Sequence, residues 1–461
     1  MIKCMNAASF RIGLLSLAAL AIAGIAQGAA PSTAKKGETF IIGTDAPLAS
    51  VASFNVQIES IDAVDTVSNT STPLLSGPIT VDFARFNGLQ TLLDINQVPA
   101  GTYNEVVVTL GTAQIGYLAT ASGAAPTIQT MNATLTTNTL TRTFKSPITV
   151  SETIPVGIRL DFDLHKSIQV TNGQISGNVD PVIQIGIVGP DAPEAFIDEF
   201  DTAVLSTDAG AQSFMVQGPH GRKWTIDVTG RTEWENGAAF GDLNTNTIAQ
   251  ISGTLDRATA TITADDISIL SQSGFYAGGL ATYVTPSSGK ASSFDLYVRG
   301  LLPASGTGVQ LGQIATVDLA GTEKFSIRWD RNPLIQFLFN SSSILPGQSI
   351  AVGGPASGAA KAGAVTVKRV NLRDWGYVGH VVKGSVKVGK GTFQVQVDGF
   401  AGQLIPQTVT VYVTDRCEFR YGYTGLHELE GGDLVRVVGL LLKNPVNGST
   451  VLVGRYVDYL N

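Results

Sequence analysis

The stretches PGQSIAVGG at residues 346–354 and GGDLVRVVG at residues 431–439 share the pattern Gly-(Gln/Asp)-x-(Ile/Val)-x-Val-x-Gly. A glycine followed by a polar residue suits a tight turn, and alternating Ile and Val residues are typical of a strand with one buried face. The closing glycine permits a bend or a bulge. A weaker copy, NTIAQISG, occupies residues 246–253. The same short segment in three places predicts a small β domain that is repeated along the chain.

Each copy belongs to a unit with the same order of segments. An alternating strand opens the unit, a second strand follows, and a further strand comes after the shared pattern. The opening segments are FMVQG at 214–218, FDLYVRG at 294–300 and FQVQVDG at 393–399. Units of about 70–100 residues with about five strands fit small OB-like barrels, in which closure removes the unpaired sheet edges. We therefore expect three OB-like barrels, at residues 200–272, 275–375 (with insertions) and 377–461.

Residues 38–190 have strand periodicity without this repeat. In FNVQIES, the residues Phe54, Val56 and Ile58 fall on one face at period two. The segment GIRLDFDL repeats the arrangement with Ile158, Leu160, Phe162 and Leu164. Strands at a spacing of about 10 residues, separated by clusters of Gly, Pro and Asn, are typical of a β-sandwich. The predicted fold is therefore all-β: an N-terminal β-sandwich followed by three small OB-like β-barrels.

Three segments of residues 38–190 carry a family resemblance. They are GTDAPLASVASFNVQIESIDAV, VDFARFNGLQTLLDINQVPAGTYNEVVVTL and LDFDLHKSI. These segments resemble a domain family of secreted bacterial proteins whose function is unknown. The resemblance implies a sandwich similar to the transthyretin-like, carboxypeptidase-regulatory domains, and it implies no catalytic residue. The three repeats resemble a second bacterial family of unknown function, OB-like barrels that occur in tandem in exported proteins.

Residues 1–28 have the features of a signal peptide. Lys3 and Arg11 give positive charge, the apolar run IGLLSLAALAIAGIA follows, and Ala26-Gln27-Gly28 supplies the small residues that signal peptidase requires. The run is about 15 residues long, which is short for a helix that spans a bilayer, and no other segment is apolar enough. We expect an exported protein, periplasmic or extracellular, with no membrane span in the mature chain.

The distribution of charge argues against nucleic acid as a partner. Charged residues make up only 15% of the chain, and its formal net charge is −7. Residues 38–201 hold 17 acidic and five basic residues, a net charge of −12, whereas residues 202–461 hold 20 acidic and 21 basic residues. Nucleic-acid-binding proteins normally present a basic face. Neither part of this chain is basic enough to predict one.

Removal of the signal peptide leaves Cys417 as the only cysteine, so an internal disulfide is excluded. We expect Cys417 to be a half-buried strand residue that acts as a small hydrophobic group. An intermolecular bridge or a reactive thiol is the alternative.

Asp161, Asp163 and His165 form a candidate metal site. Residues two apart on a strand point to the same face, so two carboxylates and an imidazole would project together. Carboxylate oxygens and imidazole nitrogens are ligands for divalent metals. The alternative is that these polar residues cover the solvated face of a strand.

A second acidic cluster lies in GPDAPEAFIDEFDTA at residues 189–203, the expected domain boundary. Its acidic residues are Asp191, Glu194, Asp198, Glu199 and Asp201. Calcium takes about six to eight oxygen ligands, but the spacing does not match an EF-hand. We expect no cofactor, with calcium or another divalent metal as the alternative. A solvated, self-repelling linker is the other interpretation of this segment.

Phe419, Tyr421 and Tyr423 in CEFRYGYTG are the candidate ligand-stacking residues. They surround Arg420 and follow a strand of the third barrel. Exposed aromatic rings stack on sugars or bases, while buried rings pack in the core. The lack of a predicted basic face favours a neutral glycan over nucleic acid.

The sequence contains no recognised catalytic motif. His-Glu-x-x-His, Gly-x-Ser-x-Gly, a phosphate-binding loop and paired-cysteine zinc spacing are all absent from it. We therefore expect a non-catalytic binding or scaffold protein of the cell envelope that contacts polysaccharide or a protein partner. Two alternatives stay open. One is a hydrolase of envelope polymers that uses paired carboxylates as acid and base, and the other is a structural spacer stabilised by a metal.

Overall fold

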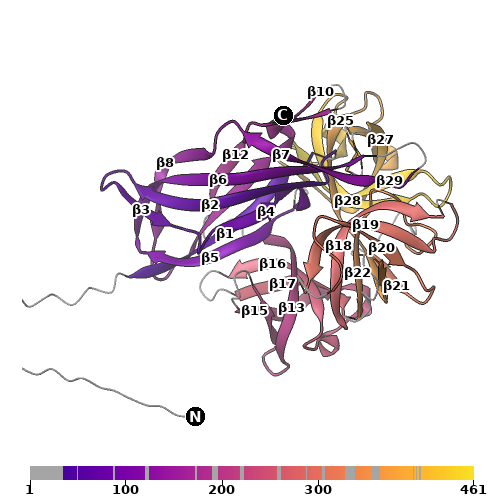
Figure 1. Cartoon of the computed structure of the whole chain (residues 1–461), viewed down its shortest axis with the longest axis horizontal. Helices are drawn as coiled ribbons and strands as arrows, with labels where there is room; N and C mark the ends of the chain where they lie inside the picture. Colours follow the sequence, from indigo (N-terminus) through magenta and orange to yellow (C-terminus); the bar gives the residue numbers. More distant parts are fainter. Residues whose placement is uncertain are drawn as a thin grey trace, which may run out of the picture. The chain divides into compact units, whose positions relative to one another are not determined.

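Strands account for nearly all of the secondary structure in the computed structural model (Figure 1). The structure describes residues 35–48, 50–86, 89–119, 124–171, 174–188, 196–218, 223–256, 261–286, 288–303, 307–327, 338–355, 364–397, 399–400, 402–403 and 406–460. No helix within these ranges is long and apolar enough to cross a bilayer. The expected signal peptide lies outside the described residues. The described chain is all-β, with an N-terminal sandwich followed by barrels.

Two β-sheets form the sandwich. The first has the strand order β12-β9-β1-β5, and β1 runs parallel to β9. Its strands are β1 (Lys36–Ala46), β5 (Thr91–Pro99), β9 (Val156–Asp163) and β12 (Ile183–Val188). In the second sheet β6 pairs with β2, β7 and β8. Its strands are β2 (Ser53–Asp65), β3 (Thr70–Pro73), β4 (Ile79–Asp82), β6 (Gly101–Ala119), β7 (Thr127–Leu135), β8 (Thr139–Val150), β10 (Ile168–Thr171) and β11 (Gln174–Val179). The short helices η1 (Phe83–Arg85) and α1 (Leu164–Ser167) follow β4 and β9.

The predicted alternation places the sandwich core correctly. The ring centroid of Phe162 lies 5.1 Å from that of Phe54 and 5.0 Å from that of Phe83, and all three rings are fully buried. The other residues predicted to face inwards are also fully buried: Val56, Ile58, Ile158, Leu160 and Leu164. Alternation of apolar and polar residues was thus sufficient to identify the inner faces of β2 and β9.

Strand β1 of the four-stranded sheet is buried on both of its faces. Ile41 belongs to the sandwich core, whereas Phe40 and Ile42 belong to an apolar cluster that includes Phe200 and Trp224 of the first barrel. Strand β1 therefore shows an almost continuous run of buried residues instead of a period of two. The sandwich and the first barrel share this apolar cluster.

The first and third barrels are closed and have the same strand order. In barrel 1 the order is β13-β14-β15-β17-β16, and in barrel 3 it is β25-β26-β27-β29-β28. In both, the third and fifth strands pair in parallel. The strands of barrel 1 are β13 (Phe196–Asp208), β14 (Ser213–Gln217), β15 (Lys223–Trp234), β16 (Ile248–Asp256) and β17 (Thr261–Ser271). Those of barrel 3 are β25 (Trp375–Val381), β26 (Thr392–Val397), β27 (Gln407–Arg420), β28 (Leu434–Lys443) and β29 (Thr450–Tyr459).

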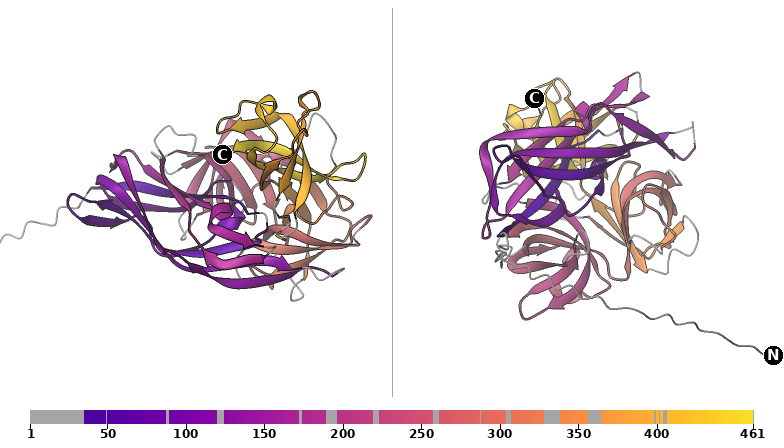
Figure 2. Two further views of the ribbon diagram at one scale, coloured as in Figure 1. Left: turned by 90° about the horizontal axis from the view of Figure 1, so that it is seen from above. Right: turned by 60° about the vertical axis from the view of Figure 1, so that its left-hand side comes forward.

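Barrel 2 follows the same order, but two of its strands are divided. Its strands are β18 (Gly274–Thr285), β19 (Ser293–Leu302), β20 (Ile314–Asp318), β21 (Lys324–Ile327), β22 (Ser349–Pro355), β23 (Ala364–Thr366) and β24 (Arg369–Arg373). The third strand is divided into β20 and β21, and the fifth strand is divided into β23 and β24. As in the other barrels, the third and fifth strands pair in parallel: β20 pairs with β23, and β21 pairs with β24. The sheet curls round on itself in the right-hand view of Figure 2. This is the unit for which the sequence predicts insertions.

The repeated sequence pattern forms the fourth strand of each barrel, β16, β22 and β28. Gly347 and Gly432 lie in the preceding turns with φ of 93° and 106°, a conformation that favours glycine. Gly439 lies at a β-bulge, where a Cβ atom would come within 2.0 Å of the carbonyl oxygen of Val453. The shared glycines therefore serve the turn and the bulge that the sequence predicts.

The predicted order of segments omits the first strand of each barrel. β13, β18 and β25 precede FMVQG, FDLYVRG and FQVQVDG, which form the second strands β14, β19 and β26. Barrel 1 begins at Phe196, inside the segment predicted as a linker and before the expected boundary at residue 200. β18 is buried along nearly its whole length, and β25 likewise. These strands lack the alternation that identifies a strand with one solvated face.

Candidate functional site

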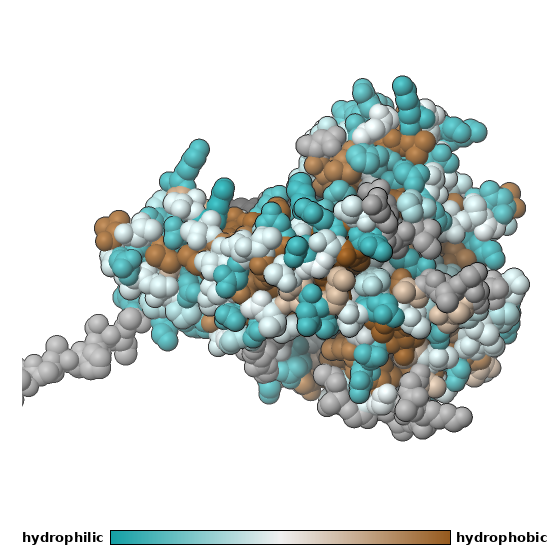
Figure 3. All heavy atoms as spheres, turned by 45° about the horizontal axis from the view of Figure 1, so that its top comes forward, coloured by the Kyte–Doolittle hydropathy of each residue, from teal (hydrophilic) through white to brown (hydrophobic). Residues whose placement is uncertain are grey.

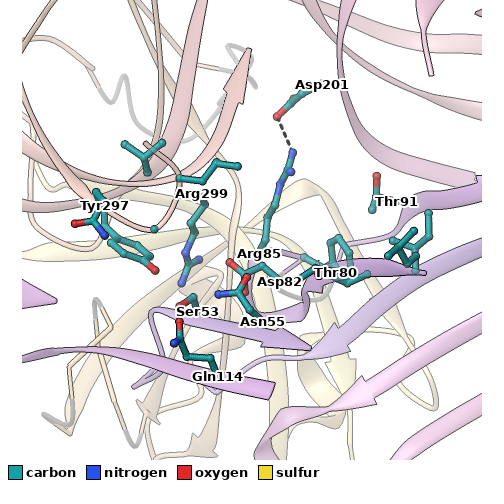
Figure 4. A pocket seen from close by; sticks show the side chains of 18 of the residues that line it. Ser53, Asn55, Thr80, Asp82, Arg85, Thr91, Gln114, Asp201, Tyr297 and Arg299 are labelled. Atoms are coloured by element: carbon teal, nitrogen blue, oxygen red, sulfur yellow. Dashed lines mark hydrogen bonds and ion pairs between the residues drawn. The ribbon is translucent and has the colours of Figure 1, made fainter. Parts of the chain in front are cut away.

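A cavity of about 740 Å³ lies where the sandwich meets barrels 1 and 2 (Figure 4). We call it the junction cavity. Its wall includes Ser53, Asn55, Asp82, Arg85, Tyr297 and Arg299. Hydroxyl and amide side chains supply much of the remaining polar lining, among them Thr80, Thr91, Gln114, Thr130 and Gln313. A cavity of this size accommodates a small ligand.

Arg299, on β19, is a nearly buried cation with 7% exposure. Its terminal nitrogens donate hydrogen bonds to the carbonyl oxygens of Ala84 and Val51, each at 3.3 Å. Its Cζ lies 4.4 Å from the ring centroid of Trp375. Within the described residues no carboxylate forms an ion pair with this guanidinium, and its Nε has no hydrogen-bond partner. Such a group is uncommon, because burying a charge without a counter-ion costs several kcal/mol, on the order of the penalty for breaking a buried pair.

Asp82, at the end of β4, lies near Arg299 in the junction cavity (Figure 4). Its Oδ1 accepts a hydrogen bond from the backbone N–H of Phe54 at 2.8 Å. Burial raises the pKa of Asp82, and the charges of Arg299 and Arg85 oppose that rise without cancelling it. The carboxyl group of Asp82 therefore keeps its proton to a higher pH than an exposed aspartate does.

Asp201, on β13, closes another side of the junction cavity. Its carboxylate accepts hydrogen bonds from Arg373 at 3.0 Å, Tyr276 at 2.5 Å and Gln250 at 2.9 Å. Burial disfavours the ionised form, but the guanidinium groups of Arg373 and Arg85 outweigh it and hold the pKa of Asp201 below its usual range. Both carboxylate oxygens of Asp201 are thus committed to contacts inside the protein.

These contacts correct the prediction of a solvated acidic linker and calcium site. Asp198 is 3% exposed, and Glu199 forms an ion pair with Arg373. The acids are held on β13 because the apolar residues of the same segment point into the core of barrel 1. Asp191 and Glu194 lie outside the described residues.

A second cavity, of about 340 Å³, lies between the sandwich and barrel 3. We call it the tyrosine pocket. Its wall includes Arg159, Asp161, Asp163, His165, Tyr421 and Tyr459. The candidate metal residues and one candidate stacking residue, more than 250 positions apart in the chain, therefore meet in one pocket.

The three candidate metal residues line the tyrosine pocket without forming a metal-binding cluster. β9 ends at Asp163, whose side chain accepts a hydrogen bond from the backbone N–H of Lys166 at 2.9 Å and so caps α1. His165 lies on this helical turn and not on the strand, which corrects the predicted common face. Asp161 pairs with Arg159 at 3.0 Å, and Asp163 pairs with Lys166 at 2.9 Å. The ranges that the structure describes contain no group of three or more His, Cys, Asp and Glu side chains placed to hold a metal ion.

Two buried polar atoms of the tyrosine pocket have no hydrogen-bond partner in the described structure. They are Oδ1 of Asp161, an acceptor, and Nε of Arg159, a donor. Burial raises the pKa of Asp161, although Arg159 and Arg436 oppose that rise. Buried polar groups are normally paired, so an unpaired acceptor and an unpaired donor in one pocket call for an explanation.

The three candidate stacking residues have different environments. Tyr421 is 58% exposed and has a φ of 57°, an uncommon conformation for a residue other than glycine. Tyr423 is buried and donates a hydrogen bond to Asp433, and Phe419 packs against the core of barrel 3. The prediction of a platform of three rings is therefore corrected: Tyr421 alone of the three lies exposed at a pocket.

The sequence analysis does not predict the junction cavity. Asp82, Arg85 and Arg299 come from β4, η1 and β19, and none of them belongs to a recognisable motif. The one available signal was an arginine in the apolar strand segment FDLYVRG, where Arg299 interrupts a run of buried residues. Only the packing of the modules brings these residues together.

Comparisons with known proteins identify part of the sandwich. Residues 39–178 match the family described as a domain of unknown function (DUF4382). No curated protein matches the chain. Among solved structures, the chain is similar to drosophila Unr CSD456, with 11% sequence identity over 57% of this chain and 97% of that chain. The TM-score of 0.14 is too low to support an argument about fold. The comparisons therefore place a domain of unknown function at residues 39–178 and assign no activity.

Proposed function

We propose that the protein is a non-catalytic, exported binding protein of the cell envelope that holds a neutral polysaccharide in the tyrosine pocket. One observation carries the proposal: the exposed ring of Tyr421 stands at a pocket whose wall also includes the polar side chains of Asp161, Arg159 and His165. The signal-peptide features of residues 1–28 support export.

A saccharide suits a pocket that combines an exposed ring with polar side chains. Its hydroxyl groups both donate and accept hydrogen bonds, so they can pair with donors and acceptors of the pocket wall. The apolar face of a sugar ring packs on an aromatic ring such as that of Tyr421. The charged groups at the pocket already have opposite charges beside them, since Asp161 pairs with Arg159 and Asp163 with Lys166. A neutral ligand suits this balance better than an ion does.

The surface also favours a polar ligand over a broad protein partner. On the face shown in Figure 3, hydrophobic residues form separate groups among hydrophilic ones. Stable protein interfaces usually have a continuous apolar centre. This face has no such centre among the residues that are coloured.

The test is calorimetric titration of residues 29–461 with neutral oligosaccharides: cellohexaose, chitohexaose, maltohexaose, xylohexaose and mannohexaose. We expect one of them to bind. Tyr421→Asn removes the ring and suits the left-handed backbone better than alanine does. This variant should raise Kd about tenfold, because removing an aromatic anchor costs on the order of 1–2 kcal/mol.

The matched control is Tyr283→Thr, at a half-buried tyrosine of β18 that lines neither cavity. It should leave Kd unchanged. Binding that persists unaltered in Tyr421→Asn would remove the tyrosine pocket from the proposal. Failure of every oligosaccharide to bind would favour a protein partner instead.

Hydrolysis is the second candidate, and one observation favours it. Asp82 and Asp201 both line the junction cavity, and their environments shift the two pKa values in opposite directions. Such a difference is typical of an acid and base pair. Against it, both oxygens of Asp201 already accept hydrogen bonds from protein groups. Release of reducing ends from the same oligosaccharides, lost in Asp82→Asn, would establish the hydrolase and overturn the non-catalytic proposal.

A further inference from the structure

Arg299 distinguishes the junction cavity from the tyrosine pocket. Its guanidinium is 7% exposed, lines the cavity and makes no ion pair with any carboxylate in the described part of the chain. Arginine stays ionised even when buried. Its hydrogen bonds to Ala84 and Val51 are both long, at 3.3 Å, and its Nε has no partner. The protein thus holds a positive charge at the cavity and leaves part of its hydrogen-bonding capacity unused.

Arg85 adds a second guanidinium to the same wall (Figure 4). Its side chain is 44% exposed, and its ion pair with Asp201 is long, at 3.4 Å. Asp201 has a closer partner in Arg373, at 3.0 Å. The ion pair of Arg85 with Asp201 is therefore weak, and the Arg85 side chain can turn towards a ligand. Asp201 would then still have Arg373 as its counter-ion.

The groups around Arg299 do not neutralise it. Ser53, Asn55 and Gln114 are uncharged and line the cavity near it in Figure 4. The nearest acidic influence is Asp82, whose burial favours the neutral carboxyl group. The charged side chains of the wall are Arg85, Arg299, Asp82 and Asp201, and among them the printed ion pair joins Arg85 to Asp201, not a carboxylate to Arg299.

We infer that the junction cavity binds the carboxylate group of a small ligand, with Arg299 and Arg85 as its ion-pair partners and Asn55 and Gln114 as neutral donors beside them. A planar carboxylate matches the geometry of a guanidinium and supplies the ion-pair partner that Arg299 lacks among the described residues. A dianion such as phosphate would bring a second negative charge into a partly buried site. This inference concerns a different cavity from the one in the proposed function and does not depend on it.

The experiment measures binding of acetate, D-glucuronate and D-galacturonate to residues 29–461 by ligand-observed NMR and thermal shift. D-Glucose, D-galactose and inorganic phosphate serve as comparison ligands. We expect the carboxylates to bind and stabilise the protein, the neutral sugars to have no effect at this cavity, and phosphate to bind at least about tenfold more weakly.

Two variants test the cavity without removing the buried Arg299, whose loss risks unfolding. Arg85→Gln should raise Kd for the carboxylates at least about tenfold, whereas Arg142→Gln, at an exposed arginine of β8, should not change it. Asp82→Asn keeps the acceptor for Phe54 N–H and removes the competing acid, so it should lower Kd.

Three results would overturn the inference: equal binding of phosphate and carboxylates, unchanged affinity in Arg85→Gln, or weaker carboxylate binding in Asp82→Asn. None of these three results bears on oligosaccharide binding at Tyr421, which is tested separately.

Discussion

Single charged residues in this protein differ in how their charge is balanced. Asp458 on β29 accepts hydrogen bonds from Arg420 and Arg436, each at 2.7 Å. Burial opposes ionisation of Asp458, but the two guanidinium groups outweigh it and lower its pKa. Arg436 is buried to a similar degree as Arg299, yet Arg436 has this carboxylate and Arg299 has none. This contrast is the reason for assigning a ligand to the cavity at Arg299.

The thiol of Cys417 should be unreactive in the folded protein. Burial, followed by the charges of Glu418 and Asp458, raises its pKa to about 12. An unfolded cysteine has a pKa of about 8.5, so at pH 8 the folded thiol is on the order of a thousandfold less ionised. We expect labelling by a disulfide reagent at pH 8 to be far slower in native protein than in guanidinium chloride, with Cys417→Ser as the unlabelled control.

The raised pKa of Cys417 determines how the stability of the protein changes with pH. Below about pH 8.5 the thiol is neutral in both states and the stability is unaffected. As pH rises from about 8.5 towards 12, only the unfolded chain ionises, so stability falls in the wild type and falls less in Cys417→Ser. Fast labelling of native protein at pH 8 would contradict this account.

Strands that have one solvated face were predictable from the sequence, and strands buried on both faces were not. β2 and β14 alternate, and the sequence identifies them. β18 and β25 are buried along most of their length and escaped detection. The acidic residues of β13 predict a solvated linker, whereas Arg373 of barrel 2 forms ion pairs with two of them. In each case the missing information was a contact with another module.

Substitution of Gly439 in β28 tests whether the closing glycine of the repeated pattern is required at the β-bulge. A Cβ atom there would lie 2.0 Å from the carbonyl oxygen of Val453 on β29, so backbone must move. We expect Gly439→Ala to lower the free energy of unfolding by about 1–3 kcal/mol, as overpacking does. Urea denaturation measures the change. Gly389→Ala, where the added methyl group meets nothing within 4 Å, is the control and should change stability little.

Contacts between modules tie the described residues 35–460 together. Gln348 of barrel 2 donates a hydrogen bond to the carbonyl oxygen of Leu441 in barrel 3 at 2.9 Å. Arg436 of barrel 3 donates a hydrogen bond to the carbonyl oxygen of Asp45 in the sandwich at 3.0 Å. Apolar clusters also cross the boundaries. Both candidate sites lie at such boundaries, which is why single sequence segments did not reveal them. The relation of the sandwich to transthyretin-like domains stays a prediction.

Arg373 of barrel 2 forms ion pairs with Glu199 and Asp201 of barrel 1, beside other contacts between the two barrels. We expect Arg373→Met to lower the free energy of unfolding by about 3–5 kcal/mol, because it leaves Glu199 and Asp201 buried without their main counter-ion. Scanning calorimetry should show barrel 1 melting earlier. Adding Asp201→Asn should recover part of the loss, and Arg142→Met is the surface control. A loss no greater than in that control would show that the pair does not hold the barrels together.

The strand order of the barrels has a consequence for folding during synthesis. In barrel 3, β29 inserts between β27 and β28, so those two strands remain open edges until the last of the five arrives. During synthesis from the N-terminus, each barrel therefore passes through a state in which four strands are present and the sheet is still open. At that stage an edge of one unit can pair with the corresponding strand of its neighbour. Because the three units differ in sequence outside the repeated pattern, a strand of one unit fits the open edge of another less well than its own edge.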